Sequence, residues 1–174
     1  RIINIYVPNG SAINSEKFKY KIDWLNKFKL YLEKQELRDE PTIILGDFNI
    51  APSSKDIHSP EKHEGSIMAS EIERRALKNV LKDRFIDSFR VFEKSSGFWS
   101  WWDYRNKAFE LNRGWRIDHI YINSSLLPYL KSSVIGKDQR GNNQPSDHAP
   151  IMINLNINDL CNNFSTNDED FFEI

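Results

Sequence analysis

Hydrophobic positions along the chain follow two different periods, which together predict alternating strands and helices. Apolar runs typical of strands occupy residues 2–7, 42–46, 116–122 and 151–157. The last of these alternates isoleucine or leucine with methionine and asparagine, which predicts a strand with one more polar face. Strands and helices that alternate in this way are typical of an α/β (α+β) domain.

Two stretches instead repeat their apolar residues at helical spacing. The first covers residues 16–37 and places five side chains on one face: Phe18, Ile22, Leu25, Phe28 and Leu32. The second begins at Ser70, which stands three residues before a glutamate, the spacing of a capping box. Its apolar side would consist of Ile72, Ala76, Leu77, Val80 and Leu81. Residues 53–69 and 136–147 are polar or rich in turn-forming residues, which predicts loops.

Composition adds the size and the broad class of the domain. Residues 1–157 are expected to form one domain or part of one, because 39% of the 174 residues are hydrophobic, enough for a core. Residues 158–174 contain five acidic and no basic side chains, which predicts a disordered acidic tail and leaves residues 1–157 with a net charge of +4. No apolar run approaches the length of a membrane span. A single cysteine, Cys161, excludes an internal disulfide and favours a reducing, cytoplasmic location.

Polar side chains follow the predicted strand at 42–46. Asp47 and Asn49 are two residues apart, so in an extended chain both would lie on one face, opposite Phe48. A carboxylate can bind Mg²⁺ or accept a proton, and an amide can donate to a phosphate oxygen. Glycine, aspartate and asparagine are also common turn formers, so a simple turn is the alternative.

Two further polar sites lie near strands. Asp147 and His148 are adjacent before the last strand and could supply a metal ligand and a general base, or simply form a solvated loop. Asp118 stands within an apolar strand and needs a partner if it is buried. That partner could be a histidine, as in a His–Asp dyad, or a nearby arginine, Arg113 or Arg116.

Aromatic residues are dense between residues 98 and 115. They include Trp99, Trp101, Trp102, Tyr104 and Trp115, with cationic side chains interleaved. Such mixtures can stack on bases or sugars and contact phosphates. Since most aromatic side chains belong to the core, at least two of these five are expected to be buried.

Taken in order, the motifs "IYVPNG", "ILGDFNIAP", "WSWWDYR", "NRGWRIDHI" and "SDHAPI" resemble those of the exodeoxyribonuclease III family of abasic-site endonucleases. This family belongs to the wider endonuclease/exonuclease/phosphatase superfamily, and the resemblance covers nearly all of residues 1–157. It implies part of a four-layer αββα sandwich in which each half of the domain contributes one sheet. The matching segment starts near the middle of the family pattern, so the N-terminal half, with its metal-ligand glutamate, is expected to be absent.

The resemblance also implies roles at the phosphate. Asp47 would activate the attacking water or protonate the leaving group, and Asn49 would hold the phosphate near the metal. Tyr6 would contact the scissile phosphate, and Asn9 would provide a further phosphate contact.

A second set of implied roles concerns the metal and the histidine. Asp147 would lie near or on the metal ion, and His148 would bind the phosphate or act as a base. Asp118 would orient His148. The expected cofactor is Mg²⁺ or Mn²⁺, with its ligands drawn from Asp47, Asn49, Asp147 and His148.

The remaining implied roles concern DNA. Trp101, Trp115 and Ile117 would wall a pocket for the abasic sugar, and Arg113 would contact DNA. The resemblance thus predicts a DNA repair nuclease that cuts 5′ to abasic sites and acts on the 3′ ends of duplex DNA as an exonuclease and phosphatase. Its partners would be that DNA and the absent half of its own domain, without a membrane.

Two other functions fit the residues less well. One is a superfamily phosphatase or phosphodiesterase acting on a small or lipid phosphate. The Trp and Arg motifs are evidence against this function. The other is a non-catalytic DNA-binding fragment. Because an exposed apolar sheet face is costly, the chain alone is expected to be marginally stable or self-associating, and nearly inactive.

Overall fold

The computed structural model describes residues 1–35, 40–156 and 158. Its strands are β1 (Ile2–Tyr6), β2 (Ile43–Asp47), β3 (Phe85–Asp87), β4 (Asp118–Asn123), β5 (Leu130–Ile135) and β6 (Ile151–Leu155). Its helices are α1 (Glu16–Lys34), α2 (Pro60–His63), α3 (Glu71–Leu81) and α4 (Ser88–Phe92). Apart from residue 158, the predicted acidic tail lies outside the described residues.

The larger sheet has the strand order β1-β2-β4-β3. β1 and β2 are parallel, while β4 runs antiparallel to both β2 and β3. The register pairs Tyr6 with Asp47 and Asp47 with Asp118. Since paired residues on neighbouring strands project to the same face, this register gathers the three residues at one end of the sheet.

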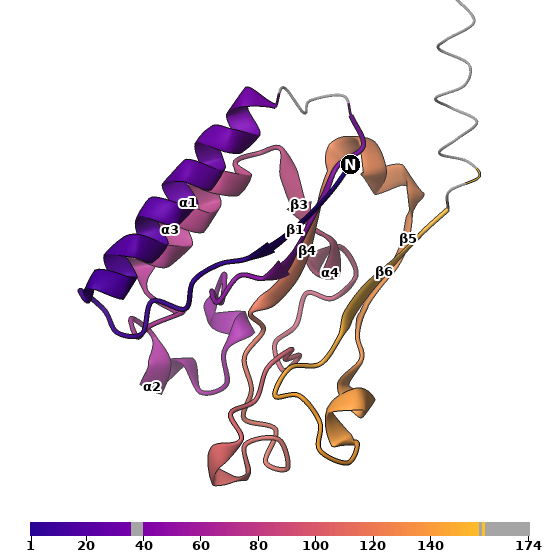
Figure 1. Cartoon of the computed structure of the whole chain (residues 1–174). Coiled ribbons are helices and arrows are strands. Elements are labelled where there is room, and N and C mark those ends of the chain that lie inside the picture. The colour runs from indigo at the N-terminus through magenta and orange to yellow at the C-terminus, as the bar shows by residue number, and fades with distance from the viewer. Residues whose placement is uncertain (36–39, 157, 159–174) are drawn as a thin grey trace, which may run out of the picture.

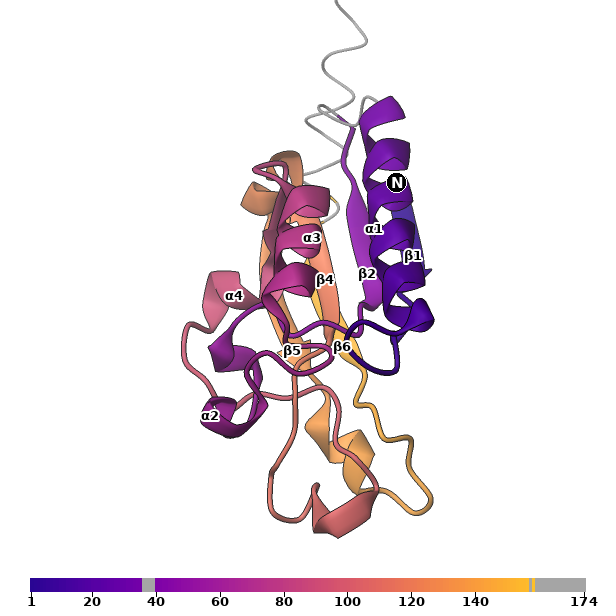
Figure 2. The same cartoon turned by 90° about the vertical axis from the view of Figure 1, so that its left-hand side faces the viewer.

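Helices α1 and α3 lie side by side on one face of this sheet (Figures 1 and 2). The predicted apolar face of α1 is confirmed, since Leu25 and Leu32 join a core cluster with Ile44 of β2 and with Phe48, which follows that strand. The capping box that begins α3 is also confirmed. Ile72, predicted for the buried side of α3, is 51% exposed, so this assignment was wrong.

A second sheet differs from the expectation of one sheet in this chain. β5 and β6 form an antiparallel pair that packs against the larger sheet on the side away from α1 and α3 (Figure 1). Ile120 and Ile122 of β4 form one cluster with Ile151 and Ile153 of β6. This contact covers β4, whereas Ile2 on edge strand β1 stays 71% exposed. β5 was not predicted because Lys131 and two serines hide its strand pattern.

Among the described residues, no helix combines the length and the apolar character that crossing a membrane requires.

Candidate active site

The end of β2 carries the first two site residues. Asp47 ends the strand, and Asn49 then takes a left-handed conformation with φ of +49°. The expectation of an extended chain through Asn49 was therefore wrong, because the backbone turns there. The turn still brings the two together: the Asn49 backbone N–H donates to Asp47 Oδ1 at 2.8 Å, and its side-chain Nδ2 donates to Oδ2 at 3.0 Å.

The start of β4 carries the second carboxylate. His148 Nδ1 lies 2.8 Å from Asp118 Oδ2, so these residues, 30 positions apart, form a His–Asp pair. The backbone N–H groups of Ile117 and Asp118 both donate to Ser100 Oγ at 3.0 Å, which holds the strand in place. Arg116, the alternative partner for Asp118, instead projects to Asp56 and Asp87.

Asp47, Asp118 and His148 converge on one point. One ligand atom from each lies within 4.8 Å of the other two, which makes the group able to hold a metal ion. Carboxylate oxygens suit Mg²⁺ or Mn²⁺, and an imidazole nitrogen can join them. The group contains Asp118, which was expected only to orient the histidine. Asp147 lies outside this group, and its Oδ2 accepts a hydrogen bond from Trp101 Nε1 at 2.9 Å.

The electrostatics of this group shift two pKa values upward. Burial, reinforced by the nearby charge of Asp118, raises the pKa of Asp47 to about 6. Burial lowers the pKa of His148, but the hydrogen bond and charge of Asp118 outweigh it, so the net shift is upward. A carboxyl group whose pKa is close to neutrality can both accept and donate protons under physiological conditions.

Two asparagines brace the end of β2. Asn9 Nδ2 donates to Asn49 Oδ1 at 3.0 Å, and Asn49 Nδ2 also donates to Val7 O at 3.0 Å. Both amide hydrogens of Asn49 are thus used within the protein, and its side chain is only 4% exposed. Tyr6, paired in register with Asp47, is 63% exposed and open to a ligand.

The aromatic residues divide between core and surface. Trp99, Trp102 and Trp115 are buried, which confirms the expectation that at least two of the five would be. Trp115 and Ile117, expected to wall a sugar pocket, belong to one core cluster; Ile117 is 1% exposed and can line a pocket only from beneath. Trp101 is half-buried beside them, and Arg113 is exposed.

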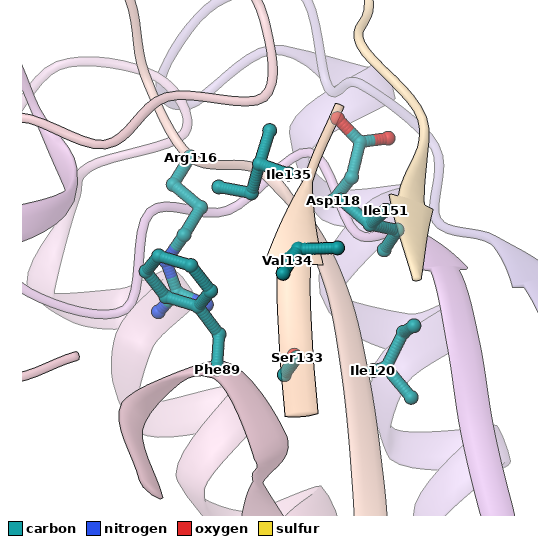
Figure 3. Close-up of a pocket in the computed structure, with 8 residues that line it drawn as sticks. All are labelled: Phe89, Arg116, Asp118, Ile120, Ser133, Val134, Ile135 and Ile151. Carbon is teal, nitrogen blue, oxygen red and sulfur yellow. The ribbon is translucent and has the colours of Figure 1, made fainter. Parts of the chain in front are cut away.

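A small cavity lies between the two sheets, next to Asp118 (Figure 3). Its volume is about 10 Å³, space for one water molecule and too little for a sugar. Its walls are formed by Phe89, Arg116, Asp118, Ile120, Ser133, Val134, Ile135 and Ile151. A substrate would therefore approach the open end of the sheet, where Tyr6 is exposed.

Sequence reasoning missed several residues that hold this site. Ser100 carries no signal in an aromatic run, and the buried charges of Lys21 and Glu73 look like ordinary surface residues of two helices. The capping-box spacing located Glu73 but did not reveal that it contacts Lys21. Side-chain partners from distant segments leave no local pattern.

Residues 4–148 match the Endonuclease/Exonuclease/phosphatase family, and the chain belongs to it. This family match agrees with the α/β fold and with the acidic and histidine residues gathered at the end of the larger sheet.

Similar proteins narrow the comparison. The chain is 32% identical over 157 residues to an exodeoxyribonuclease of Bacillus subtilis and 35% identical over 158 residues to an exodeoxyribonuclease III of Haemophilus influenzae. These matches cover 90% and 86% of the chain but 60% and 59% of those relatives, so the chain spans about three fifths of their length.

Two solved structures are also similar to this chain. A Neisseria 3′ phosphatase bound to a product DNA hairpin has a TM-score of 0.86 and 36% identity, covering 90% of this chain and 61% of that one. An AP endonuclease from Archaeoglobus fulgidus has a TM-score of 0.84 and 34% identity, covering 89% and 61%.

Proposed function

We propose that the protein containing this chain is a DNA repair nuclease that hydrolyses phosphodiester bonds with a divalent metal ion. The observation that carries the proposal is the convergence of Asp47, Asp118 and His148 at one end of the sheet. The names of the similar proteins support it, since they are exodeoxyribonucleases and AP endonucleases. The proposed substrates are duplex DNA cut 5′ to abasic sites and DNA 3′ ends, trimmed by exonuclease and 3′-phosphatase action.

Asp118, His148 and Asp47 would have different roles in the hydrolysis. An ionised Asp118 can only accept hydrogen bonds, so His148 Nδ1 would carry the proton of that pair and leave Nε2 to accept one or to contact phosphate. Hydrolysis adds water to phosphorus and breaks the bond to the leaving oxygen, which must gain a proton. Asp47 would activate the water or protonate the leaving oxygen.

A divalent metal ion fits the acidic pair. Asp47 and Asp118 would hold Mg²⁺ or Mn²⁺, with Asn49, Asp147 and His148 as the further candidate ligands. A bound metal ion would supply positive charge that stabilises the charge developing on the phosphate oxygens. Around it, Tyr6 and Asn9 would contact the phosphate, and Trp101 and Arg113 would contact the sugar and the DNA. Trp115 and Ile117 would support the sugar pocket from beneath.

We also propose that a further part of the same domain completes this site. Two observations support this: the matched relatives are longer, and Ile2 and Tyr6 leave one face of β1 open beside the site. The single cysteine, Cys161, supports a reducing location such as the cytoplasm.

The test is incision of a labelled duplex that contains one abasic analogue, with Mg²⁺, by the full-length protein. We expect EDTA-sensitive nicking 5′ to the analogue and its loss, by two or more orders of magnitude, in Asp47→Ala. A duplex with a 3′ phosphate measures phosphatase action in parallel. Asp138→Ala, at an exposed aspartate in the loop before β6, is the matched control and should cleave normally.

Other outcomes would replace the proposal. Binding of DNA without cleavage, unaffected by Mg²⁺ or by Asp47→Ala, would favour a non-catalytic DNA-binding protein. Hydrolysis of inositol or lipid phosphates with no action on DNA would favour a superfamily phosphatase or phosphodiesterase.

A further inference from the structure

A fully buried ion pair lies behind the candidate active site. Lys21 of α1 and Glu73 of α3 are both 0% exposed, and Lys21 Nζ lies 2.5 Å from Glu73 Oε1. Complete burial of both partners is unusual, because lysine and glutamate are among the residues most often exposed. The pair therefore needs an explanation beyond surface solvation.

Every polar group of this pair has a partner. The three N–H groups of Lys21 donate to Glu73 Oε1, to Asn49 O at 2.8 Å and to Asn9 O at 3.2 Å. Glu73 also accepts from Met68 N at 3.0 Å, from Ser70 N at 3.1 Å and from Ser70 Oγ at 2.6 Å. The lysine has no further donor to offer.

The two carbonyls that Lys21 binds belong to site residues. Asn9 and Asn49 are also joined through their side chains, by the bond from Asn9 Nδ2 to Asn49 Oδ1. Asn49 has a positive φ, a conformation that needs support from its surroundings, and its N–H groups bind the Asp47 carboxylate. Lys21 thus holds the backbone of both asparagines while their amides hold each other and Asp47.

The chain makes room for this contact at Gly10. This residue has a φ of +88°, and a Cβ added to it would lie 3.1 Å from Lys21 Cδ. The lysine stem therefore passes close beneath the loop that carries Asn9. The loop ends at Ser15, which bonds Gly10 O and caps α1, so α1 positions both the lysine and the loop.

Stability alone does not account for the pair. Removing two charges from water costs several kcal/mol per ion, and replacing a buried ion pair with neutral groups of similar volume is often neutral or stabilising. By the same reasoning, apolar side chains of similar volume at 21 and 73 would be tolerated between α1 and α3. They would leave the carbonyls of Asn9 and Asn49 without their donor.

We propose that Lys21 and Glu73 are positioning residues that fix Asn9 and Asn49, and through Asn49 the Asp47 carboxylate, in the geometry needed for phosphodiester hydrolysis. This inference deepens the proposed function and rests on it. Neither residue would touch the substrate.

The test uses the full-length protein with both charges removed together, in Lys21→Met/Glu73→Gln. The double variant leaves no unpaired buried charge, and glutamine keeps an acceptor for Ser70. The matched control is Lys82→Met/Glu33→Gln. It removes an ion pair between Glu33 of α1 and Lys82, the residue that follows α3, at the other ends of the two helices. Both variants are first compared with wild type by denaturant unfolding and assayed where all are folded.

Two measurements then test the positioning role of Lys21 and Glu73. Steady-state cleavage of the abasic duplex should show kcat lowered about 10²-fold for the site variant, with KM within about twofold of wild type, because misplaced groups slow the chemical step. The side-chain amide resonances of Asn9 and Asn49, followed by NMR in ¹⁵N-labelled protein, should shift in the site variant and stay in place in the control. A purely structural pair would leave kcat unchanged wherever both variants are folded.

The outcomes separate this inference from the proposed function. If wild type cleaves no DNA, the proposed function fails, and unshifted asparagine resonances would then overturn the inference as well. If wild type cleaves DNA but the site variant keeps its kcat, or keeps the asparagine resonances unchanged, the positioning role is overturned while the nuclease proposal stands.

Discussion

At the scale of single residues, the candidate site contains a carboxyl group whose charged form is destabilised by its surroundings. Asp47 is largely buried next to a second carboxylate, Asp118, and its pKa is raised to about 6. Both conditions disfavour its charged form, which is the form that would bind a metal ion. Such conflicts are common at functional sites, where local stability is given up for chemistry.

The pKa of Asp47 makes this conflict measurable. A folded-state pKa above the ordinary 3.8 means that the native state binds the proton more tightly, so stability falls as pH rises from about 4 to about 6. Asp47→Asn should therefore stabilise the metal-free protein at pH 8 by about 1–2 kcal/mol, allowing for partial exposure, and have little effect at pH 4. Urea unfolding in EDTA at both pH values checks this.

The control for that experiment is Asp138→Asn at an exposed aspartate, which removes one negative charge without removing a buried one. Equal stabilisation by Asp47→Asn at pH 4 and pH 8 would contradict the assigned shift.

At the scale of elements, the parallel contact between β1 and β2 brings Tyr6 beside Asp47. This contact depends on Gly46, which has a φ of +133° and opposes Ile5 in the register. A Cβ at position 46 would lie 1.9 Å from Ile5 O, so only glycine permits this approach of the two strands. The glycine of the "GDFN" motif is thus a packing requirement immediately before the carboxylate.

Gly46→Ala should destabilise the protein by about 2–4 kcal/mol, because the strand must shift away from the Ile5 carbonyl and adopt a strained φ. Gly97→Ala separates these two causes, since Gly97 has a φ of +98° but no atom within 4 Å of the added Cβ. Thermal and urea unfolding of both variants measure the difference. A Gly46→Ala cost no larger than that of Gly97→Ala would show that the close approach is relaxed in solution.

At the scale of the whole molecule, a buried charge network joins three segments that are distant in sequence. Arg116 Nε donates to Asp56 Oδ1 at 2.7 Å, and its Nη2 donates to Asp87 Oδ2 at 2.6 Å. Arg90 Nη2 adds a second donor to Asp56 Oδ1 at 2.6 Å. The network fixes the chain between Trp115 and Asp118, and so connects the core to the site.

This network predicts a loss of stability in acid. The charges of Arg116 and Arg90 outweigh burial and lower the pKa of Asp56 to about 2. A depressed folded-state pKa contributes stability that is present above pH 3.8 and is lost as pH falls toward 2, here about 2 kcal/mol. Asp56→Asn should destabilise the protein at pH 6 by about 3 kcal/mol, since Arg116 loses a buried partner.

Denaturant unfolding between pH 2.5 and pH 6 checks this, with exposed Asp83→Asn as the control. The control should keep the steep acid dependence, and Asp56→Asn should flatten it. An unchanged slope in Asp56→Asn would assign the acid sensitivity to other groups.

Local patterns in the sequence determined much of this protein. Strands and helices with clear periodicity were found where predicted, because a buried face needs regular apolar spacing. The motifs that carry Asp47, Asp118 and His148 indicated the family before any geometry was known. The short strand β3 and the serine-containing strand β5 were not predicted, because these strands depend on pairing with neighbours rather than on their own residues.

Only the tertiary structure decided which polar groups meet. Asp118 had two kinds of partner available, and the fold placed His148 against it while Arg116 pairs with Asp56 and Asp87. In the sequence, Lys21 and Glu73 look like solvated helix residues. The packing of α1 against α3 buries both of them and brings them together. Contacts between segments far apart in sequence depend on packing that no local period encodes, so chemistry can be indicated by the chain but is assembled by the fold.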